Sequence, residues 1–190
     1  AAGLAQIDNL NSMSFDGIND SINCGIAAPL NTAFTKASFS LWAKTTTWTN
    51  SNFTLFNNRP NSAINGFGLN TYALNLYAYI AGVGNLNIPF SSSGFIDGEW
   101  NHILLTIDIT EPVSSDRVKF YINGGNAIKR SGANPHVPST NNLLIGDGLR
   151  GAYNGEIDEF AMWDVTLTEA EALSIYNATA VVGGVNKTAD

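Results

Sequence analysis

Hydrophobic and polar residues alternate in short runs along the chain. In residues 38–44, Phe39, Leu41 and Ala43 occupy alternate positions, and mostly polar residues lie between them. Successive side chains of a β-strand point to opposite faces, so this run predicts a half-buried strand. Residues 100–108 alternate in the same way and predict a second strand of similar length.

Further short runs are rich in β-branched and aromatic residues and are bounded by Gly, Asn or Pro, as strands joined by turns are. These runs cover residues 12–16, 21–25, 53–57, 65–70, 73–81, 85–90, 118–122 and 142–146. Asn123 and Gly124 tolerate a positive φ and predict a tight turn after residues 118–122. So many short strands in one chain predict an all-β fold, built as a sandwich or a barrel.

One segment has the pattern of a helix. Thr168 and Glu171 form a capping box, which predicts a short helix from this point to about Asn177. Residues 178–190 are small and polar without periodicity, and are predicted to be a tail or linker. We therefore expect one domain over residues 10–177, preceded by an N-terminal extension of residues 1–9.

The last strand pattern, in residues 155–163, contains a change of phase. Phe160 and Met162 share one face, whereas Ile157 is out of phase with them by one residue. A β-bulge near Asp158 and Glu159 would restore the phase, and bulges re-aim the side chains around them.

Composition and charge narrow the classes of function. Of the 190 residues, 44 % are hydrophobic and 13 % are charged, and the net charge is −7. An acidic chain without a run of Lys or Arg would be repelled by a phosphate backbone, so we expect no nucleic-acid partner. No apolar run approaches the length of a membrane-spanning helix, so we expect no membrane insertion. The single cysteine, Cys24, excludes an intramolecular disulfide and is interpreted as a small buried hydrophobic residue.

Acidic residues gather at two places in the predicted strand pattern. One is the bulge at Asp158 and Glu159, and the other is the turn that contains Asp16, Asn19 and Asp20. Such residues often only stabilise turns, because Asp and Asn accept hydrogen bonds from their own backbone. Brought together, their carboxylates and the turn carbonyls would suit Ca²⁺, which takes six to eight oxygen ligands.

An ordered set of sequence blocks resembles the laminin-G-like branch of the concanavalin A-like lectin/glucanase superfamily. The blocks are FDGINDS, FSLWAK, EWNHILLTID, KFYING, LLIG and GEIDEFAMWDVTLTEAEALSIYN, and they extend over residues 12–177. The resemblance implies a jelly-roll sandwich of two antiparallel sheets. It also implies a non-catalytic module of a secreted, cell-surface or virion protein that binds a glycan or a surface protein.

The resemblance also implies a structural calcium ion, because members of this family often hold Ca²⁺ where the first turn meets the last strand. Carried over by motif, the side-chain ligands would be Asp16 and Asp158. Asn19, Asp20 and Glu159 are further candidates, since a loop can supply carbonyl oxygens in place of side chains. Such an ion would tie a terminal strand to the sandwich.

The same superfamily contains glycoside hydrolases, so the sequence must also be compared with their catalytic carboxylate pattern. Laminarinase-like enzymes carry their carboxylates as E-x-D-x-E on one strand, and retaining glycosidases need both a nucleophile and an acid/base. Glu156 and Asp158 match the first two positions, but Phe160 or Ala161 stands where the acid/base belongs. The sequence therefore predicts a protein that is not an enzyme.

Four aromatic residues are candidates for a glycan-binding surface, because sugar sites combine aromatic rings with hydrogen-bonding groups. Trp48 and Tyr72 have polar neighbours in the sequence and are expected to be exposed. Tyr77 and Tyr79 share one face of their predicted strand and would form a platform of two rings. The alternative is that these rings pack in the core or under a loop.

A second interpretation of the whole chain stays open at this point. Low charge and a surface rich in Asn, Thr, Ser and Gly also suit a structural or decoration domain of a larger assembly, such as a phage virion or a cell-surface array. Its partners would then be other subunits of that assembly. Both interpretations predict an extracellular, cell-surface or virion location.

Overall fold

The protein folds as two stacked six-stranded sheets with a helix on one of them. The computed structural model describes residues 12–26, 32–48, 52–59, 64–179, 181–182 and 185–186. The first sheet, sheet A, has the order β1 (Met13–Asp16), β12 (Asn154–Trp163), β3 (Lys36–Lys44), β8 (Trp100–Asp108), β9 (Val118–Ile122) and β10 (Ile128–Arg130). The second, sheet B, has the order β2 (Ile22–Asn23), β11 (Leu144–Ile145), β4 (Thr54–Asn57), β5 (Phe67–Tyr72), β6 (Asn75–Ile80) and β7 (Gly84–Pro89).

The remaining elements are short. They are the 3₁₀ turns η1 (Phe90–Ser92) and η2 (Ser114–Asp116), the helix α1 (Glu169–Thr179), and the strands β13 (Val181–Val182) and β14 (Val185–Asn186). Strand pairing within both sheets is antiparallel throughout the described residues. The predicted jelly-roll sandwich of two antiparallel sheets is therefore confirmed.

Aromatic side chains join the two sheets at the centre of the core. Phe39 of sheet A lies 5.5 Å from Phe56 and 5.0 Å from Phe67, both on sheet B, measured between ring centroids. All three side chains are buried. Aromatic rings bury a large apolar area and add about 0.5–1.5 kcal/mol per ring pair, so this cluster fixes how the sheets stack.

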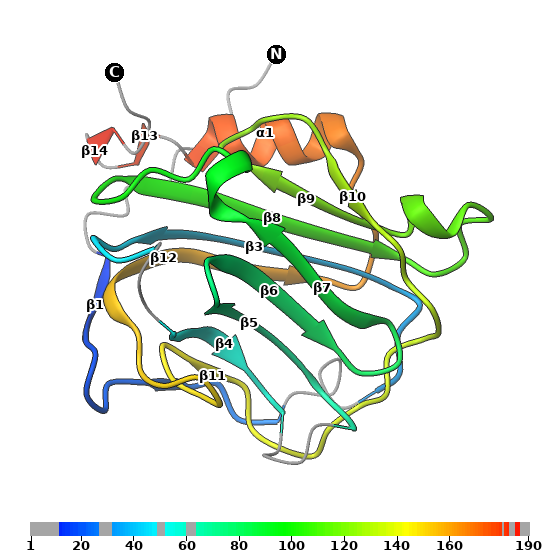
Figure 1. Ribbon diagram of the computed structural model, residues 1–190, viewed down its shortest axis with the longest axis horizontal. Coiled ribbons are helices and arrows are strands. Elements are labelled where there is room, and N and C mark those ends of the chain that lie inside the picture. The colour runs from blue at the N-terminus through cyan, green and yellow to red at the C-terminus, as the bar shows by residue number, and fades with distance from the viewer. Residues whose placement is uncertain are drawn as a thin grey trace, which may run out of the picture.

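The helix α1 covers the outer face of sheet A, which gives the molecule the three layers seen in Figure 1. Trp42, on the face of β3 that the sequence predicted to be polar and exposed, is only 1 % exposed and stacks on Tyr176 of α1 with 5.6 Å between centroids. Leu104, Tyr121 and Ala172 form a small second core at this interface. The prediction of a half-buried strand was wrong because its second face is covered too.

The predicted capping box begins the helix. The amide of Thr168 donates to Oε2 of Glu171 at 2.7 Å, and the amide of Glu171 donates to Oγ1 of Thr168 at 3.3 Å. These bonds satisfy amide groups that have no partner within the helix. Among the described residues, no helix is long and apolar enough to span a membrane.

The β-bulge predicted in the last long strand is confirmed. The register between β12 and β3 shifts between Asp158 and Ala161, and Glu159 has a φ of 51°. Ile157 is buried before the bulge, and Phe160 packs against the same core after it. One additional residue thus keeps the apolar side chains of β12 on the core side.

The structure adds two features that the sequence patterns did not predict. Strand β10 pairs with β9 although Ile128–Arg130 is too short to show alternation. The segment expected to be a tail contains the end of α1 and the antiparallel pair β13 and β14. Their valines have high β propensity, which short-range periodicity does not detect.

One buried histidine, His136, makes the stability of the fold depend on pH. The ring of His136 stacks on Phe34 at 4.1 Å and lies 5.6 Å from the ring of Phe67. Burial lowers the pKa of His136 to about 4. The folded protein therefore holds a neutral imidazole at pH values where an unfolded chain would protonate it.

We expect the free energy of unfolding to fall as the pH drops from about 6.5 toward 4, because only the unfolded state takes up this proton there. The contribution is about 2 kcal/mol after allowance for solvent screening, and it does not grow further below the folded pKa. Urea denaturation of wild type and His136→Gln between pH 7 and 4 measures it. If the two stability curves stay parallel over this range, His136 is not the titrating group.

The contact of α1 with sheet A generates a second prediction. Tyr176→Ala should lower the free energy of unfolding by about 1–3 kcal/mol, because it removes the ring stacked on Trp42. Leu173→Ala is the matched control on the same helix, since Leu173 is 46 % exposed. Equal effects of the two substitutions in urea denaturation would contradict the proposed packing.

Candidate ligand-binding face

The outer face of sheet B carries three of the four aromatic residues predicted to bind a ligand. Tyr77 and Tyr79 occupy alternate positions of β6, and both are half-buried. Tyr72, at the end of β5, is 40 % exposed, and its ring lies 5.9 Å from that of Tyr77 at an angle of 65°. The sheet thus brings Tyr72, Tyr77 and Tyr79 onto one surface.

Asparagine side chains surround these rings because of the strand register. Asn70 pairs with Tyr77, and Tyr77 pairs in turn with Asn87, whose Nδ2 donates to the tyrosine hydroxyl at 3.1 Å. Two residues further along the strands, Asn57 of β4 pairs with Gly68 of β5, and Gly68 pairs with Tyr79 of β6. A Cβ at Gly68 would lie 2.8 Å from Oδ1 of Asn57, so the glycine leaves room for the Asn57 side chain.

Two arginines lie on the tyrosine rings. Cζ of Arg59 is 3.2 Å from the ring centroid of Tyr79, and Cζ of Arg150 is 4.0 Å from that of Tyr72. A guanidinium over an aromatic face is attracted by the ring quadrupole. The surface is therefore not the bare pair of rings that the sequence predicted, because Arg59 covers one face of Tyr79.

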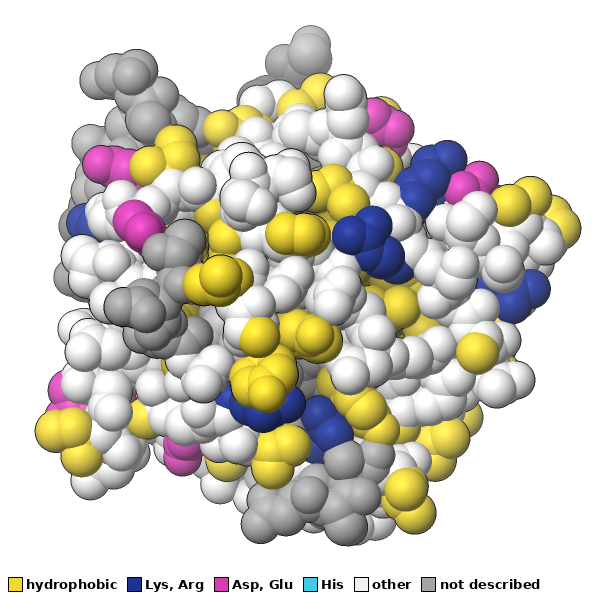
Figure 2. All heavy atoms as spheres, in the orientation of Figure 1, with side chains coloured by type: hydrophobic (Ala, Val, Ile, Leu, Met, Phe, Trp, Pro, Cys, Tyr) yellow, Lys and Arg dark blue, Asp and Glu magenta, His cyan; other side chains and the backbone are white. Residues whose placement is uncertain are grey.

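A shallow polar hollow of about 460 Å³ adjoins Arg59. Its lining comes from the strands and loops at the β2 edge of sheet B and consists of Asn23, Asn57, Arg59, Thr140, Asn141, Asn142 and Leu144. Figure 2 shows dark blue side chains lying against yellow ones where β4 and β5 run in Figure 1. The hollow and the tyrosines thus form one continuous face, which we call the sheet B face, with Arg59 between its two parts.

Trp48 is not part of this surface, and the prediction that it is exposed was wrong. Its side chain is 1 % exposed and packs against Phe53, Phe90 and Phe95, with ring centroids 4.9–5.9 Å away. The polar residues beside it in the sequence mark the loop, while the indole turns into the core. Cys24, interpreted as buried, is exposed.

The residues predicted to bind calcium are not brought together. Asp16 pairs with Asn154, and Asp158 lies four residues further along β12. At about 3.3 Å per residue, the two backbone positions are about 13 Å apart. Each carboxylate instead accepts a nearby amide, Asp16 from Ile18 at 2.8 Å and Asp158 from Glu159 at 2.8 Å.

The other calcium candidates do not complete a site. Asp20 accepts the amide of Asp16 at 2.9 Å, Asn19 is exposed, and Glu159 is the bulge residue on the distant strand. Among the described residues, no group of three or more acidic, His or Cys side chains is placed to hold a metal ion. The side chains present therefore do not fit the shared calcium site that the resemblance implies.

The carboxylates that match the hydrolase pattern lie on the face of sheet A that α1 covers. Asp158 pairs with Trp42, which lies under Tyr176. Glu156 accepts a hydrogen bond from Ser12 at 2.6 Å and lies 3.7 Å from Nζ of Lys44. At the third position Phe160 faces the core, so no carboxylate follows on this face.

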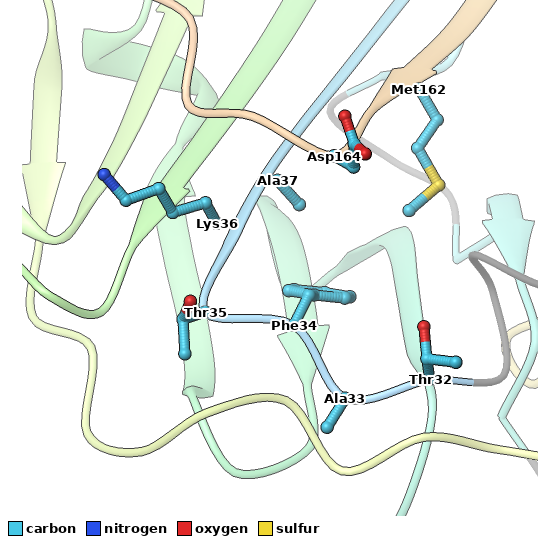
Figure 3. A pocket seen from close by; sticks show the side chains of 8 residues that line it. All are labelled: Thr32, Ala33, Phe34, Thr35, Lys36, Ala37, Met162 and Asp164. Atoms are coloured by element: carbon cyan, nitrogen blue, oxygen red, sulfur yellow. The ribbon is translucent and has the colours of Figure 1, made fainter.

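A second hollow, of about 470 Å³, lies where the chain enters β3. Figure 3 shows the ring of Phe34 in it, with Met162 and Asp164 nearby and Lys36 extending away. Nζ of Lys36 is 3.0 Å from Oδ2 of Asp108. Without a cluster of rings or hydrogen-bonding amides, this hollow is a weaker candidate than the sheet B face.

Comparison with known structures identifies the same fold in binding domains. The binding domain of botulinum neurotoxin serotype G has a TM-score of 0.66 at 14 % identity, covering 95 % of this chain and 48 % of that one. The serotype D binding domain has a TM-score of 0.65 at 18 % identity, covering 89 % and 43 %. This chain thus spans slightly less than half of each toxin domain.

A third similar structure matches over most of its own length. Domain 4 of AbnA, an extracellular arabinanase from Geobacillus stearothermophilus, was solved with arabinotriose and has a TM-score of 0.61 at 17 % identity, covering 93 % of this chain and 82 % of that one. No curated protein sequence matches the chain. At these identities, the structural matches establish the fold alone.

The sequence itself matches a family pattern over most of its length. The laminin-G-like pattern described as the concanavalin A-like lectin/glucanases superfamily covers residues 16–172. This range contains every strand of the two sheets except most of β1, and it ends in the first turn of α1. The chain is therefore a member of the concanavalin A-like lectin/glucanases superfamily, in its laminin-G-like branch.

Proposed function

We propose that the chain is a non-catalytic carbohydrate-binding module of a secreted or surface protein, and that its ligand lies on the sheet B face. The observation that carries the proposal is the convergence of Tyr72, Tyr77 and Tyr79 with several asparagines on one sheet surface. Sugar rings stack on aromatic side chains, and sugar hydroxyls need both donors and acceptors, which an amide side chain provides.

The hollow beside Arg59 has a volume suited to a ligand. Small-molecule sites typically measure about 300–1,000 Å³, and this one measures about 460 Å³. Its amide side chains would contact the hydroxyls of one sugar unit while the next unit lies over Tyr77. The arabinotriose complex of AbnA domain 4 supports a sugar ligand on a domain of this fold.

The proposal of a non-catalytic role follows from where the carboxylates lie. A retaining glycosidase needs two carboxyl groups about 5 Å apart on an open face. Here α1 packs over Trp42, the partner of Asp158 in the register, and Glu156 is engaged by Ser12 and Lys44. The three candidate tyrosines, Tyr72, Tyr77 and Tyr79, instead lie on sheet B.

Alanine substitution of two tyrosines of the sheet B face tests the location of the site. We expect Tyr72→Ala and Tyr77→Ala each to weaken polysaccharide binding at least about tenfold, because they remove the stacking surfaces. Trp163→Ala, a half-buried ring on sheet A, is the matched control and should change binding less than about twofold. Affinity electrophoresis in gels containing arabinan, xylan, laminarin or polygalacturonate, with melting curves to check folding, measures the effect.

Two results would contradict the proposed function or the location of the site. If no polysaccharide retards the folded protein and light scattering finds a stable oligomer, the chain is a structural domain of an assembly. If binding occurs but both tyrosine variants retain it, the ligand lies elsewhere than on the sheet B face.

Calcium dependence is a separate test. Because Asp16 and Asp158 lie on separate parts of β1 and β12, we expect EDTA to change neither the melting temperature nor the retardation in the gel. The same measurements with added Ca²⁺ provide the comparison. A melting temperature that rises by several degrees with Ca²⁺ would show a site that uses groups other than this pair.

A further inference from the structure

We infer that the ligand of the sheet B face is an anionic saccharide, whose carboxylate or sulfate is bound between Arg59 and Arg150. The inference rests on the proposed function and adds the chemical class of the ligand. Three observations support it: the positions of the two guanidinium groups, the lack of acidic residues around them, and a buried Nε of Arg59 that has no hydrogen-bond partner among the described residues.

The two arginines are close enough to affect each other. Both stack on tyrosines of one aromatic cluster, Arg59 on Tyr79 and Arg150 on Tyr72. Burial lowers the pKa of the Arg59 guanidinium, Tyr79 opposes that shift, and the positive charge of Arg150 lowers the pKa further. Two like charges held together repel each other, and an anion between them would remove that repulsion.

No carboxylate supplies this counter-charge within the described residues. The ion pairs there join Lys36 to Asp108, Lys44 to Glu156 and Lys129 to Asp116, all away from the sheet B face. The acidic residue nearest to Arg150 in sequence, Asp147, accepts the amide of Gly148 at 2.7 Å.

The sequence of sheet B explains why the face is positive. No Asp or Glu occurs between Asp20 and Asp97, although the whole protein has a net charge of −7. This stretch contains β2, β4, β5, β6 and β7 of sheet B, together with β3 of sheet A. Arg130 adds a third positive charge at the edge, where its Nε donates to the carbonyl of Asn87 at 2.6 Å. The face is therefore a local positive region on an acidic protein, which attracts anions.

Arg59 also has an unused donor. Its Nε is buried and has no hydrogen-bond partner among the described residues. A buried donor without an acceptor is costly, and a guanidinium is suited to bind a carboxylate or sulfate by two parallel hydrogen bonds. The hollow lined by Arg59 and asparagines would hold the rest of that sugar. On the sheet B face, the arginines would thus bind the acidic group of the sugar, the tyrosines its ring and the asparagines its hydroxyls.

The test compares matched ligands and matched variants. Isothermal titration uses polygalacturonate oligomers and the same oligomers as methyl esters, which lose the charge while keeping the sugar ring. We expect the acid form to bind at least about tenfold more tightly, with the preference decreasing between 50 and 300 mM NaCl because salt screens the attraction. Alginate and chondroitin sulfate oligomers distinguish a carboxylate from a sulfate.

The double variant Arg59→Gln/Arg150→Gln should lose the preference for the acid form. Arg59→Lys/Arg150→Lys should retain part of it, since the charge stays and the paired hydrogen bonds do not. Lys119→Gln, which removes one charge from sheet A, is the control for net charge and should keep the preference. Melting curves establish that each variant is folded.

The outcomes separate this inference from the proposed function. If neutral arabinan, xylan or laminarin binds in a Tyr77-dependent way while no acidic sugar is preferred, the inference is overturned and the carbohydrate-binding role stands. If no saccharide of either class binds, both fail. An acidic preference that survives in the double glutamine variant would also overturn the role of the arginines.

Discussion

The fold depends on covering three apolar sheet faces, the two inner faces and the outer face of sheet A, with the one α-helix found among the described residues. The inner faces of sheets A and B cover each other through Phe39, Phe56 and Phe67. The outer face of sheet A carries Trp42, Leu104 and Tyr121 and must also be shielded from water, which α1 accomplishes. Among the described residues no helix covers the outer face of sheet B, and polar and aromatic side chains lie on that face.

This arrangement decides which face is available to a ligand. The carboxylates that resemble a hydrolase pattern belong to sheet A, close to the helix, while the tyrosines, asparagines and arginines belong to sheet B. Sheet B is also poor in acidic residues, because no Asp or Glu occurs in the part of the chain that contains β2 and β4 to β7. The protein thus has an overall negative charge and one positive, aromatic surface, which favours a role in binding over a role in bond cleavage.

Much of the fold could be predicted from the sequence, because alternation, turn residues and the capping box are local signals. Strand β8 and the bulge at Glu159 are examples, and both depend only on which neighbours share a face. Burial on two sides could not be predicted for Trp42, since it depends on a helix more than a hundred residues later in the chain. The burial of Trp48 could not be predicted either, because its neighbours in the sequence are polar although its indole packs in the core.

The candidate site was predictable in part. Alternation placed Tyr77 and Tyr79 on one face, but the stacking of Arg59 on Tyr79 joins strands that only the register brings together. A signal was nevertheless present, since the long stretch without Asp or Glu leaves Arg59 with no nearby sequence partner. Register also separates the two predicted calcium ligands, because Asp16 and Asp158 lie on paired strands but are offset by four residues.

The most direct measurement of where the ligand binds is a titration of ¹⁵N-labelled protein with trigalacturonate, followed by amide chemical shifts. We expect the largest shift changes to map to β4, β5 and β6, around Arg59, Gly68 and Tyr79, and the amide shifts of α1 and β8 to stay unchanged. Shift changes concentrated on β12 around Glu156 and Asp158 would contradict it, because they would place the ligand on the sheet that the helix covers.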